Sequence, residues 1–226
     1  MSRPRVAVCL SGCGYLDGAE IQEAVLTLLA LDQAGAEAVC CAPDIDQAKV
    51  VDHRSGEPVA QRRNVLAESA RIARGKIVGV SEVDVDSIDA LVIPGGFGAA
   101  LNLCDFAAAG PDCRVDPGVE AFIKAVHKQG KPIGAICIAP ALLGRVLGRA
   151  GVNVKLTIGD DTGTAAALEQ MGVTHRAAAV TEAVTDLEHK VASTPAYMLG
   201  QGPAEVFEGI RKCVDSVLAM VAVPTV

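Results

Sequence analysis

One cysteine in the chain stands where a nucleophile would be expected. Residues 131–143 read KPIGAICIAPALL, an apolar run that breaks at Cys137 and continues through Ala139 and Pro140 into a helix-like segment. A cysteine in such a strand-to-helix turn would point its sulfur at the backbone N–H groups that open the next helix, and these donors would favour the thiolate. The pattern predicts a nucleophilic thiol with strained backbone dihedrals. A buried packing role, which is common for free cysteines, is the alternative.

A glycine-rich turn after another apolar run could supply donors to the same site. The run ALVI at 90–93 is followed by PGGFG at 94–98, which lacks the Lys-Ser/Thr of a P-loop and the spacing of a dinucleotide site. Consecutive glycines allow a tight turn that directs a backbone N–H inward. The N–H of Gly96, paired with that of Ile138, would then form an oxyanion hole facing the Cys137 sulfur. Alternatively, the glycines only let the chain turn.

Strand-like and helix-like runs alternate along the whole chain, which predicts an α/β fold with a mostly parallel central sheet flanked by helices. In open α/β sheets, ligands bind outside the carboxyl ends of the strands, where the loops 11–16, 94–98 and 137–140 would meet. The predicted strands are 5–10, 37–42, 90–93, 132–136 and 155–158, the predicted helices are 17–35, 64–75, 116–129, 162–171 and 203–221, and hairpins are expected at 48–61 and 180–194.

The first helix has clear boundary signals. Asp17 is predicted as its N-cap, with Glu20 three residues later completing a capping box, and Gly35 is predicted to end it. Cys13, in the loop between the first strand and this helix, could lie near the site at the strand ends. The alternative is that Cys13 has no part in the chemistry.

Composition narrows the class of protein. With 226 residues, half of them apolar, the chain can bury the core of one large α/β domain, so a single domain over residues 1–226 is expected. A net charge of −7 argues against partners such as nucleic acid or an anionic membrane. The eight cysteines form no C-x-x-C and have no nearby histidine at zinc spacing, so reduced thiols and no metal are expected. The first residues lead directly into a strand-like run and do not resemble a signal peptide, which favours a cytoplasmic location.

Three motifs together resemble the ThiJ/PfpI superfamily, whose fold is related to class I glutamine amidotransferases. They are PGGFGAALNL at 94–103, AICIAP at 135–140, and SGCG at 11–14 with DGAEIQEA at 17–24. The resemblance is greatest to the ElbB branch, bacterial proteins historically linked to isoprenoid biosynthesis and described as glyoxalase-like. It implies a flavodoxin-like, amidotransferase-like sandwich with small β-hairpin additions, and a homodimer, which is common in the superfamily.

The resemblance also implies a carboxylate partner for the cysteine. The family places a glutamate on the first helix, and Glu23, twelve residues before Gly35, is the corresponding position. Glu20 is a competitor, although its spacing from Asp17 gives it a capping role. Because a carboxylate beside a thiolate is repulsive, a protonated Glu23 that donates a hydrogen bond to Cys137 is the consistent state. The remaining candidate pocket residues are Glu20, Cys13, Gly95 and Phe97.

One departure from the amidotransferase pattern limits the choice of reaction. Ile138 follows the cysteine, and residues 157–161 contain no histidine, so a glutaminase triad lacks its base. The resemblance therefore implies a cofactor-independent, glyoxalase III-like lyase that converts small dicarbonyls such as glyoxal and methylglyoxal to 2-hydroxy acids. Two alternatives stay open. The protein could be a regulator or redox sensor whose Cys137 is oxidised to a sulfinate held by the same amides, or an accessory protein in isoprenoid biosynthesis. The four histidines, expected to be surface or capping residues, are His53, His127, His175 and His189.

Overall fold

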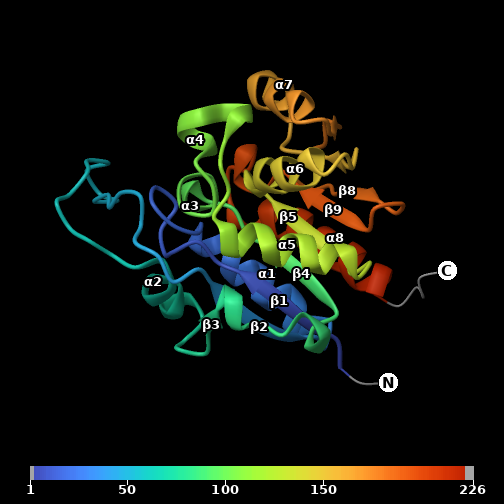
Figure 1. Cartoon of the computed structure of the whole chain (residues 1–226), viewed down its shortest axis with the longest axis horizontal. Coiled ribbons are helices and arrows are strands. Elements are labelled where there is room, and N and C mark those ends of the chain that lie inside the picture. Colours follow the sequence, from blue (N-terminus) through green and yellow to red (C-terminus); the bar gives the residue numbers. More distant parts are fainter. Residues whose placement is uncertain (1–2, 222–226) are drawn as a thin grey trace.

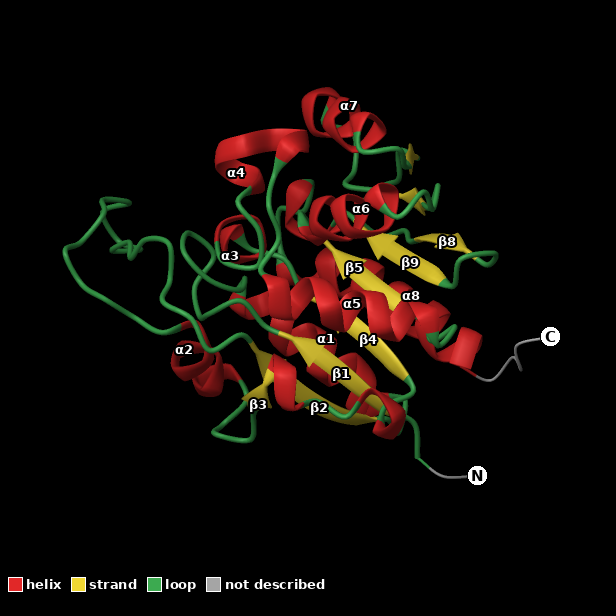
Figure 2. Cartoon of the chain, viewed as in Figure 1, coloured by secondary structure: helices red, strands yellow, loops and turns green. Residues whose placement is uncertain are grey.

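A seven-stranded sheet runs through the middle of the molecule (Figures 1 and 2). The computed structural model describes residues 3–221. The strands are β1 (Arg5–Cys9), β2 (Glu37–Ala42), β3 (Val78–Gly79), β4 (Ala90–Ile93), β5 (Ile133–Ile136), β6 (Lys155–Leu156), β7 (Thr174–His175), β8 (Val184–Asp186) and β9 (Val191–Thr194). The main sheet has the order β3-β2-β1-β4-β5-β9-β8, whereas β6 and β7 pair separately. Only the β8–β9 pairing is antiparallel among the described strand pairs of the main sheet, so the predicted, mostly parallel sheet is confirmed.

Helices cover both faces of this sheet, as Figure 2 shows. The helices are α1 (Ile21–Gln33), α2 (Val65–Ile72), α3 (Phe97–Leu101), α4 (Phe106–Ala109), α5 (Pro117–Lys128), α6 (Ala139–Arg149), α7 (Thr162–Gln170) and α8 (Pro203–Val221), with 3-10 turns η1 (Val80–Glu82), η2 (Val85–Ser87), η3 (Gly110–Asp112) and η4 (Ala196–Met198). Along β1, Val6 and Val8 join the core under α1 and α8, whereas Ala7 and Cys9 join the core under α5 and α6. Because both faces are covered, the central strands β4 and β5 contain only buried residues without polar side chains.

Several predicted boundaries are confirmed because local signals decide them. Strands β2 and β4 have the predicted limits, and the predicted hairpin at 180–194 is the antiparallel pair of β8 and β9. The Asn64 side chain accepts a hydrogen bond from the Ala67 N–H at the start of α2. Asp116 caps α5 in the same way, with Pro117 as the first helical residue.

The start of the first helix was predicted wrongly. Helix α1 begins at Ile21 with Glu20 as its N-cap, and Asp17 remains in the preceding loop. The Asp17 carboxylate accepts a hydrogen bond from the Val51 N–H at 2.8 Å, so a distant segment takes the oxygen that would have capped the helix. That segment is the loop between β2 and α2. The hairpin predicted there is reduced to one isolated antiparallel bridge, between Val51 and Pro58.

One asparagine ties together the loops at the carboxyl ends of the strands. The Asn102 side-chain amide donates to the carbonyl oxygens of Ser11 and Asp17, at 2.9 and 2.8 Å. Its side-chain oxygen accepts from the Ala48 N–H at 2.9 Å. The loop after β1, the loop between β2 and α2, and α3 are therefore held at one edge of the sheet, where the sequence analysis expected a site.

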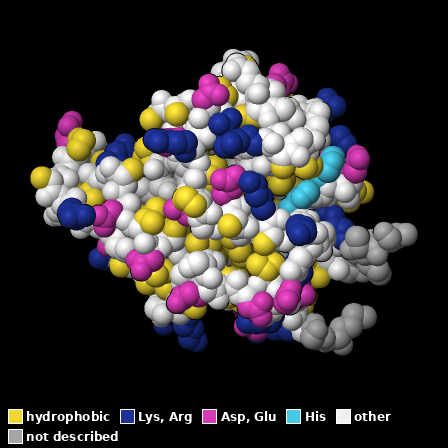
Figure 3. All heavy atoms as spheres, in the orientation of Figure 1, with side chains coloured by type: hydrophobic (Ala, Val, Ile, Leu, Met, Phe, Trp, Pro, Cys, Tyr) yellow, Lys and Arg dark blue, Asp and Glu magenta, His cyan; other side chains and the backbone are white. Residues whose placement is uncertain are grey.

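Charges of both signs are spread over the face of the molecule that Figure 3 shows. In Figure 3, Lys and Arg side chains are interspersed with Asp and Glu on the face shown, with apolar side chains between them. Within residues 3–221, no helix has both the length and the apolar character that crossing a bilayer would require.

Candidate active site

Cys137 lies in the sharp turn between β5 and α6. Its φ of 61° is in the left-handed region, which residues other than glycine rarely adopt, and its N–H donates to the Thr194 carbonyl on β9 at 2.9 Å. The strained backbone predicted for a nucleophile turn is therefore present. This conformation lifts the side chain out of the sheet toward the opening of α6.

Two backbone N–H groups donate hydrogen bonds to the Cys137 sulfur, one from Gly96 and one from Ile138. Gly96 has a φ of 92°, and a Cβ at this position would lie 2.2 Å from the Glu20 backbone nitrogen. Only glycine fits this turn, because any side chain would meet the backbone that opens α1. The structure thus brings together the two amides that the sequence analysis paired with the sulfur.

Glu23 is fully buried on α1 beside the same sulfur. Its two oxygens accept from the backbone N–H groups of Gly95, at 2.9 Å, and Tyr197, at 3.1 Å, and its carboxyl group also forms a hydrogen bond with Cys137. Burial raises the pKa of Glu23 from 4.5 to about 8. Glu23 is therefore mostly protonated at neutral pH, as expected from its position beside a thiol. Gly95 also packs tightly, since a Cβ there would lie 2.4 Å from the Cys137 Cβ.

The expected resting thiolate is not what this environment favours. Burial, together with the charge of Glu23 when it is ionised, raises the pKa of Cys137 well above its usual value of 9.0. The amides of Gly96 and Ile138 act in the opposite direction but do not outweigh the loss of hydration. At neutral pH both members of the Cys137–Glu23 pair are therefore mostly protonated, and the prediction of a lowered pKa for Cys137 is wrong.

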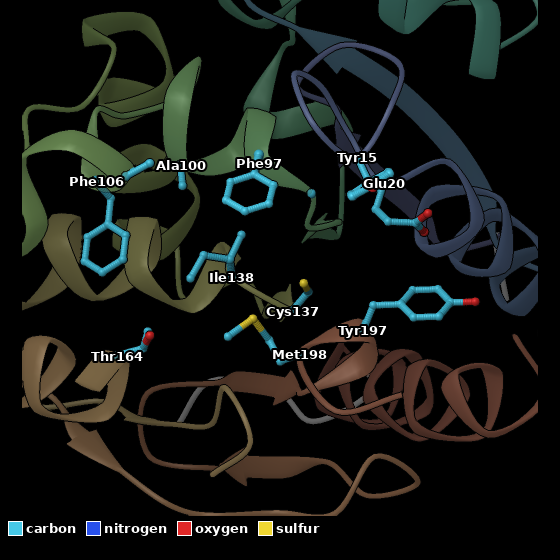
Figure 4. Close-up of a pocket in the computed structure, with 12 residues that line it drawn as sticks. Tyr15, Glu20, Phe97, Ala100, Phe106, Cys137, Ile138, Thr164, Tyr197 and Met198 are labelled. Atoms are coloured by element: carbon cyan, nitrogen blue, oxygen red, sulfur yellow. The ribbon is translucent and has the colours of Figure 1, made fainter. Parts of the chain in front are cut away.

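A pocket of about 450 Å³ opens over Cys137 (Figure 4). Figure 4 shows Cys137 near the centre of the labelled side chains, with Tyr15, Glu20 and Tyr197 on one side and Phe106 and Thr164 on the other. The lining residues are Tyr15, Glu20, Gly96, Phe97, Ala100, Phe106, Ala107, Cys137, Ile138, Thr164, Tyr197 and Met198.

The candidate pocket residues divide into two groups. Glu20 and Phe97 line the pocket as predicted. Gly95 and Cys13 are not among its lining residues. Gly95 lies behind the sulfur and holds Glu23, and Cys13 is close enough to the charges of Glu68 and Arg71 for them to influence its pKa. Burial raises the pKa of Cys13.

Residues 13–153 match the model of the DJ-1/PfpI family. The chain belongs to the DJ-1/PfpI family. A rat (Rattus norvegicus) ES1 protein homolog is 44% identical over 228 residues, which cover 96% of this chain and 84% of the relative. An isoprenoid biosynthesis protein with an amidotransferase-like domain from Ehrlichia chaffeensis superposes with a TM-score of 0.89 and 36% identity, covering 95% of this chain and 99% of that one. The predicted superfamily and fold class are confirmed.

A more distant member of the same fold has a named activity. A glyoxalase III from Candida albicans superposes on this DJ-1/PfpI chain with a TM-score of 0.61, covering 96% of this chain and 97% of that one, at 15% identity. At this identity the match shows the fold, and the dicarbonyl substrate remains a proposal for this chain.

The predicted cytoplasmic location is contradicted by the relatives. The rat ES1 homolog and its human and zebrafish counterparts all carry names that call them mitochondrial. The prediction rested on first residues that do not resemble a signal peptide, and this feature does not distinguish the cytoplasm from a mitochondrion.

In the described structure, none of the four histidines of this family member is among the residues that line the Cys137 pocket, although the His53 ring contacts the lining residue Tyr15. His53 lies 3.8 Å from Asp17, and His189 lies 3.0 Å from the buried Asp186. His127 is in the last turn of α5, and His175 is in β7. All four are at least partly exposed, in line with the surface positions expected for them.

Most residues of the pocket wall were not predicted from the sequence. Tyr197 contributes both a ring to the lining and a backbone N–H to Glu23, because the preceding Ala196 has a φ of 45°. Alanine gives no local signal of a left-handed conformation, whereas a glycine would have done. Tyr15, Phe106, Thr164 and Met198 come from segments that no short motif connects.

Proposed function

We propose that the chain is a cofactor-independent, thiol-dependent enzyme that converts small dicarbonyls, such as glyoxal and methylglyoxal, to 2-hydroxy acids. The observation that carries the proposal is the position of the Cys137 sulfur, which lies at the pocket, beneath two backbone amides and beside a buried carboxyl group. Nucleophile, oxyanion donors and proton carrier are thus within reach of one another. The shared fold of a protein named glyoxalase III is consistent with this activity.

The reaction balances without an added oxidant. Sulfur adds to the aldehyde carbon to form a hemithioacetal, and the amides of Gly96 and Ile138 would stabilise the oxygen that gains charge. The hydrogen on this carbon then moves to the neighbouring carbonyl carbon, so one carbon is oxidised to a thioester while the other is reduced to an alcohol. Water cleaves the carbon–sulfur bond, which releases the 2-hydroxy acid and restores the Cys137 thiol.

Glu23 is suited to move the protons in this sequence. A carboxyl group with a pKa of about 8 can both accept and return a proton near neutral pH. In its ionised form Glu23 would take the thiol proton, and its interaction with Cys137 supports this role. Glu20 is the other carboxyl group at the pocket, and its pKa is also raised by burial, so it is the competing proton carrier.

The test is methylglyoxal turnover by wild type, Cys137→Ala and Cys40→Ala. Both cysteines are 7% exposed, but only Cys137 lines the pocket, so Cys40→Ala is a matched control for the loss of a buried thiol. We expect Cys137→Ala to abolish lactate formation and Cys40→Ala to retain it. If wild type turns over methylglyoxal no faster than a free thiol does, the proposed enzymatic activity is wrong.

A companion pair of variants tests the carboxyl assignment. Glu23→Gln should lower turnover roughly 10²-fold, the scale of a general acid–base contribution, whereas Glu20→Gln should retain most of it. If the two results are reversed, Glu20 is the proton carrier.

A redox-sensing role is the second candidate, because the same two amides could hold the oxygens of a Cys137 sulfinate. Wild type that shows no dicarbonyl turnover but gains two oxygen atoms at Cys137 under peroxide would favour this role. An accessory role in isoprenoid biosynthesis is suggested by the name of the Ehrlichia relative alone.

A further inference from the structure

The aromatic residues of this chain are concentrated at one place. The sequence contains two tyrosines, four phenylalanines and no tryptophan. Both tyrosines and two of the phenylalanines line the pocket over Cys137 (Figure 4). They come from four separate segments: Tyr15 from the loop after β1, Phe97 from α3, Phe106 from α4 and Tyr197 from the turn after β9. Four of the six Phe and Tyr residues of the chain therefore line the pocket that contains Cys137.

Two of these rings are substantially open to solvent. Tyr15 is 49% and Phe97 is 50% exposed, although both belong to the wall of a concave site. Exposed apolar groups that cluster in a cavity mark a place where a ligand completes the burial.

Neighbouring groups contact the exposed rings. The Tyr15 ring meets His53 edge-on, with ring centroids 5.5 Å apart. The Lys49 ammonium group lies 6.0 Å from the centre of the Phe97 ring. The Tyr197 hydroxyl donates to the Gln22 side chain. The rings are therefore positioned before any ligand arrives, which lowers the entropic cost of binding.

The size of the pocket and the charge of its lining further restrict the kind of ligand that would fit. A volume of about 450 Å³ is in the range of pockets that bury drug-sized molecules, whereas glyoxal is only two joined carbonyl groups. Glu20 is the only charged side chain among the lining residues. A carboxylate on the ligand would meet this like charge, and Lys49, which contacts the Phe97 ring, is not itself a lining residue, so a neutral ligand is favoured.

We infer that the pocket binds uncharged carbonyl compounds carrying an aromatic ring or a similarly flat apolar group, and that aryl-substituted dicarbonyls are used in preference to glyoxal and methylglyoxal. The turnover part of this inference rests on the proposed dicarbonyl reaction. The binding part rests on the rings alone. Contacts between aromatic rings are more favourable than the burial of their surface alone would predict. Stacking of an aryl group against Phe97 and Phe106 would therefore favour aryl-substituted substrates.

The natural fluorescence of the protein gives a direct binding assay. Because both tyrosines line the pocket and the chain has no tryptophan, tyrosine emission reports on this site. Acetophenone is the uncharged aryl probe, and benzoate is its anionic counterpart. We expect acetophenone to quench the emission of Cys137→Ala saturably at pH 8, with benzoate binding at least tenfold more weakly. Glu20→Gln should reduce that difference.

The turnover arm compares phenylglyoxal with methylglyoxal in wild type, Phe97→Leu, Phe106→Leu and the control Phe207→Leu. Phe207 is a partly buried residue of α8 that is not among the lining residues. Losing either pocket ring should lower kcat/KM for phenylglyoxal roughly three- to tenfold more than kcat/KM for methylglyoxal, and the control should change neither.

The outcomes separate the two proposals. Turnover of methylglyoxal that equals or exceeds that of phenylglyoxal overturns the substrate preference and leaves the proposed reaction intact. Saturable acetophenone binding that is weakened in Phe106→Leu, with no dicarbonyl turnover, overturns the reaction and supports the aryl site. An absence of both overturns both.

Discussion

At the scale of single residues, the site depends on the protonation states of Cys137 and Glu23. The sequence suggested a thiolate stabilised by amide donors, and those donors are present. Burial nevertheless favours the protonated thiol, because the pKa of Cys137, like that of Glu23, rises when hydration is lost. A motif identifies which groups meet, but their protonation depends on how much water the completed fold excludes.

The effect of the Glu23 charge on the thiol predicts how Glu23→Gln changes the alkylation of Cys137. Above pH 8, wild-type Glu23 is ionised, and its negative charge raises the pKa of the thiol. Removing this charge should increase Cys137 alkylation by iodoacetamide several-fold at pH 9, because the charge disfavours the thiolate. At pH 6, where Glu23 is protonated, wild type and variant should differ little. Rates from mass-spectrometric mapping that match at pH 9 would contradict the pairing, and Glu20→Gln serves as the control.

At the scale of elements, the sequence predicted what local signals decide. Strand β4 follows from an apolar run, and α5 follows from Asp116 and Pro117. The start of α1 was missed because Asp17 resembles an N-cap, yet its oxygen accepts the distant Val51 N–H. The site shows the same dependence on contacts between distant segments. Cys137 and its amide donors lie in recognisable motifs, whereas the ring lining is assembled from segments far apart in the sequence.

The turn between β4 and α3 gives a prediction at this scale. A Cβ at Gly96 would lie 2.2 Å from the Glu20 nitrogen, so Gly96→Ala must displace the start of α1 or the turn itself. We expect an unfolding free energy lower by more than about 2 kcal/mol, and lost turnover. Gly35→Ala is the matched control, since Gly35 also has a positive φ, of 72°, but no atom within 4 Å of the added Cβ. Its cost should be limited to backbone strain of about 1 kcal/mol. Equal urea midpoints for the two variants would show that the close approach is unimportant.

At the scale of the whole molecule, the fold places an ionisable group where its neutral form is favoured. Glu23 lies in the core between the sheet and the α1–α8 layer, and its side chain has no exposed surface. Its pKa rises from 4.5 to about 8, so the folded state binds a proton that the unfolded chain releases between these values. The stability supplied by this proton is fully present below pH 4.5 and is lost as the pH rises toward 8.

The difference in unfolding free energy between wild type and Glu23→Gln should therefore depend on pH. Between pH 5 and 8, wild type should lose stability relative to the variant by up to about 1.4 kcal/mol per pH unit. Each Glu23 oxygen accepts a hydrogen bond from a backbone N–H. In Glu23→Gln the side-chain NH₂ replaces one of these oxygens and faces a backbone N–H, which is unfavourable. This cost is constant with pH and cancels from the slope. Cys137, with a pKa well above 9.0, stays protonated in both states over this range and adds no slope. Urea unfolding at pH 5, 6, 7 and 8 measures the difference, and a flat result would mean that Glu23 is ionised in the folded protein and cannot donate to the Cys137 sulfur.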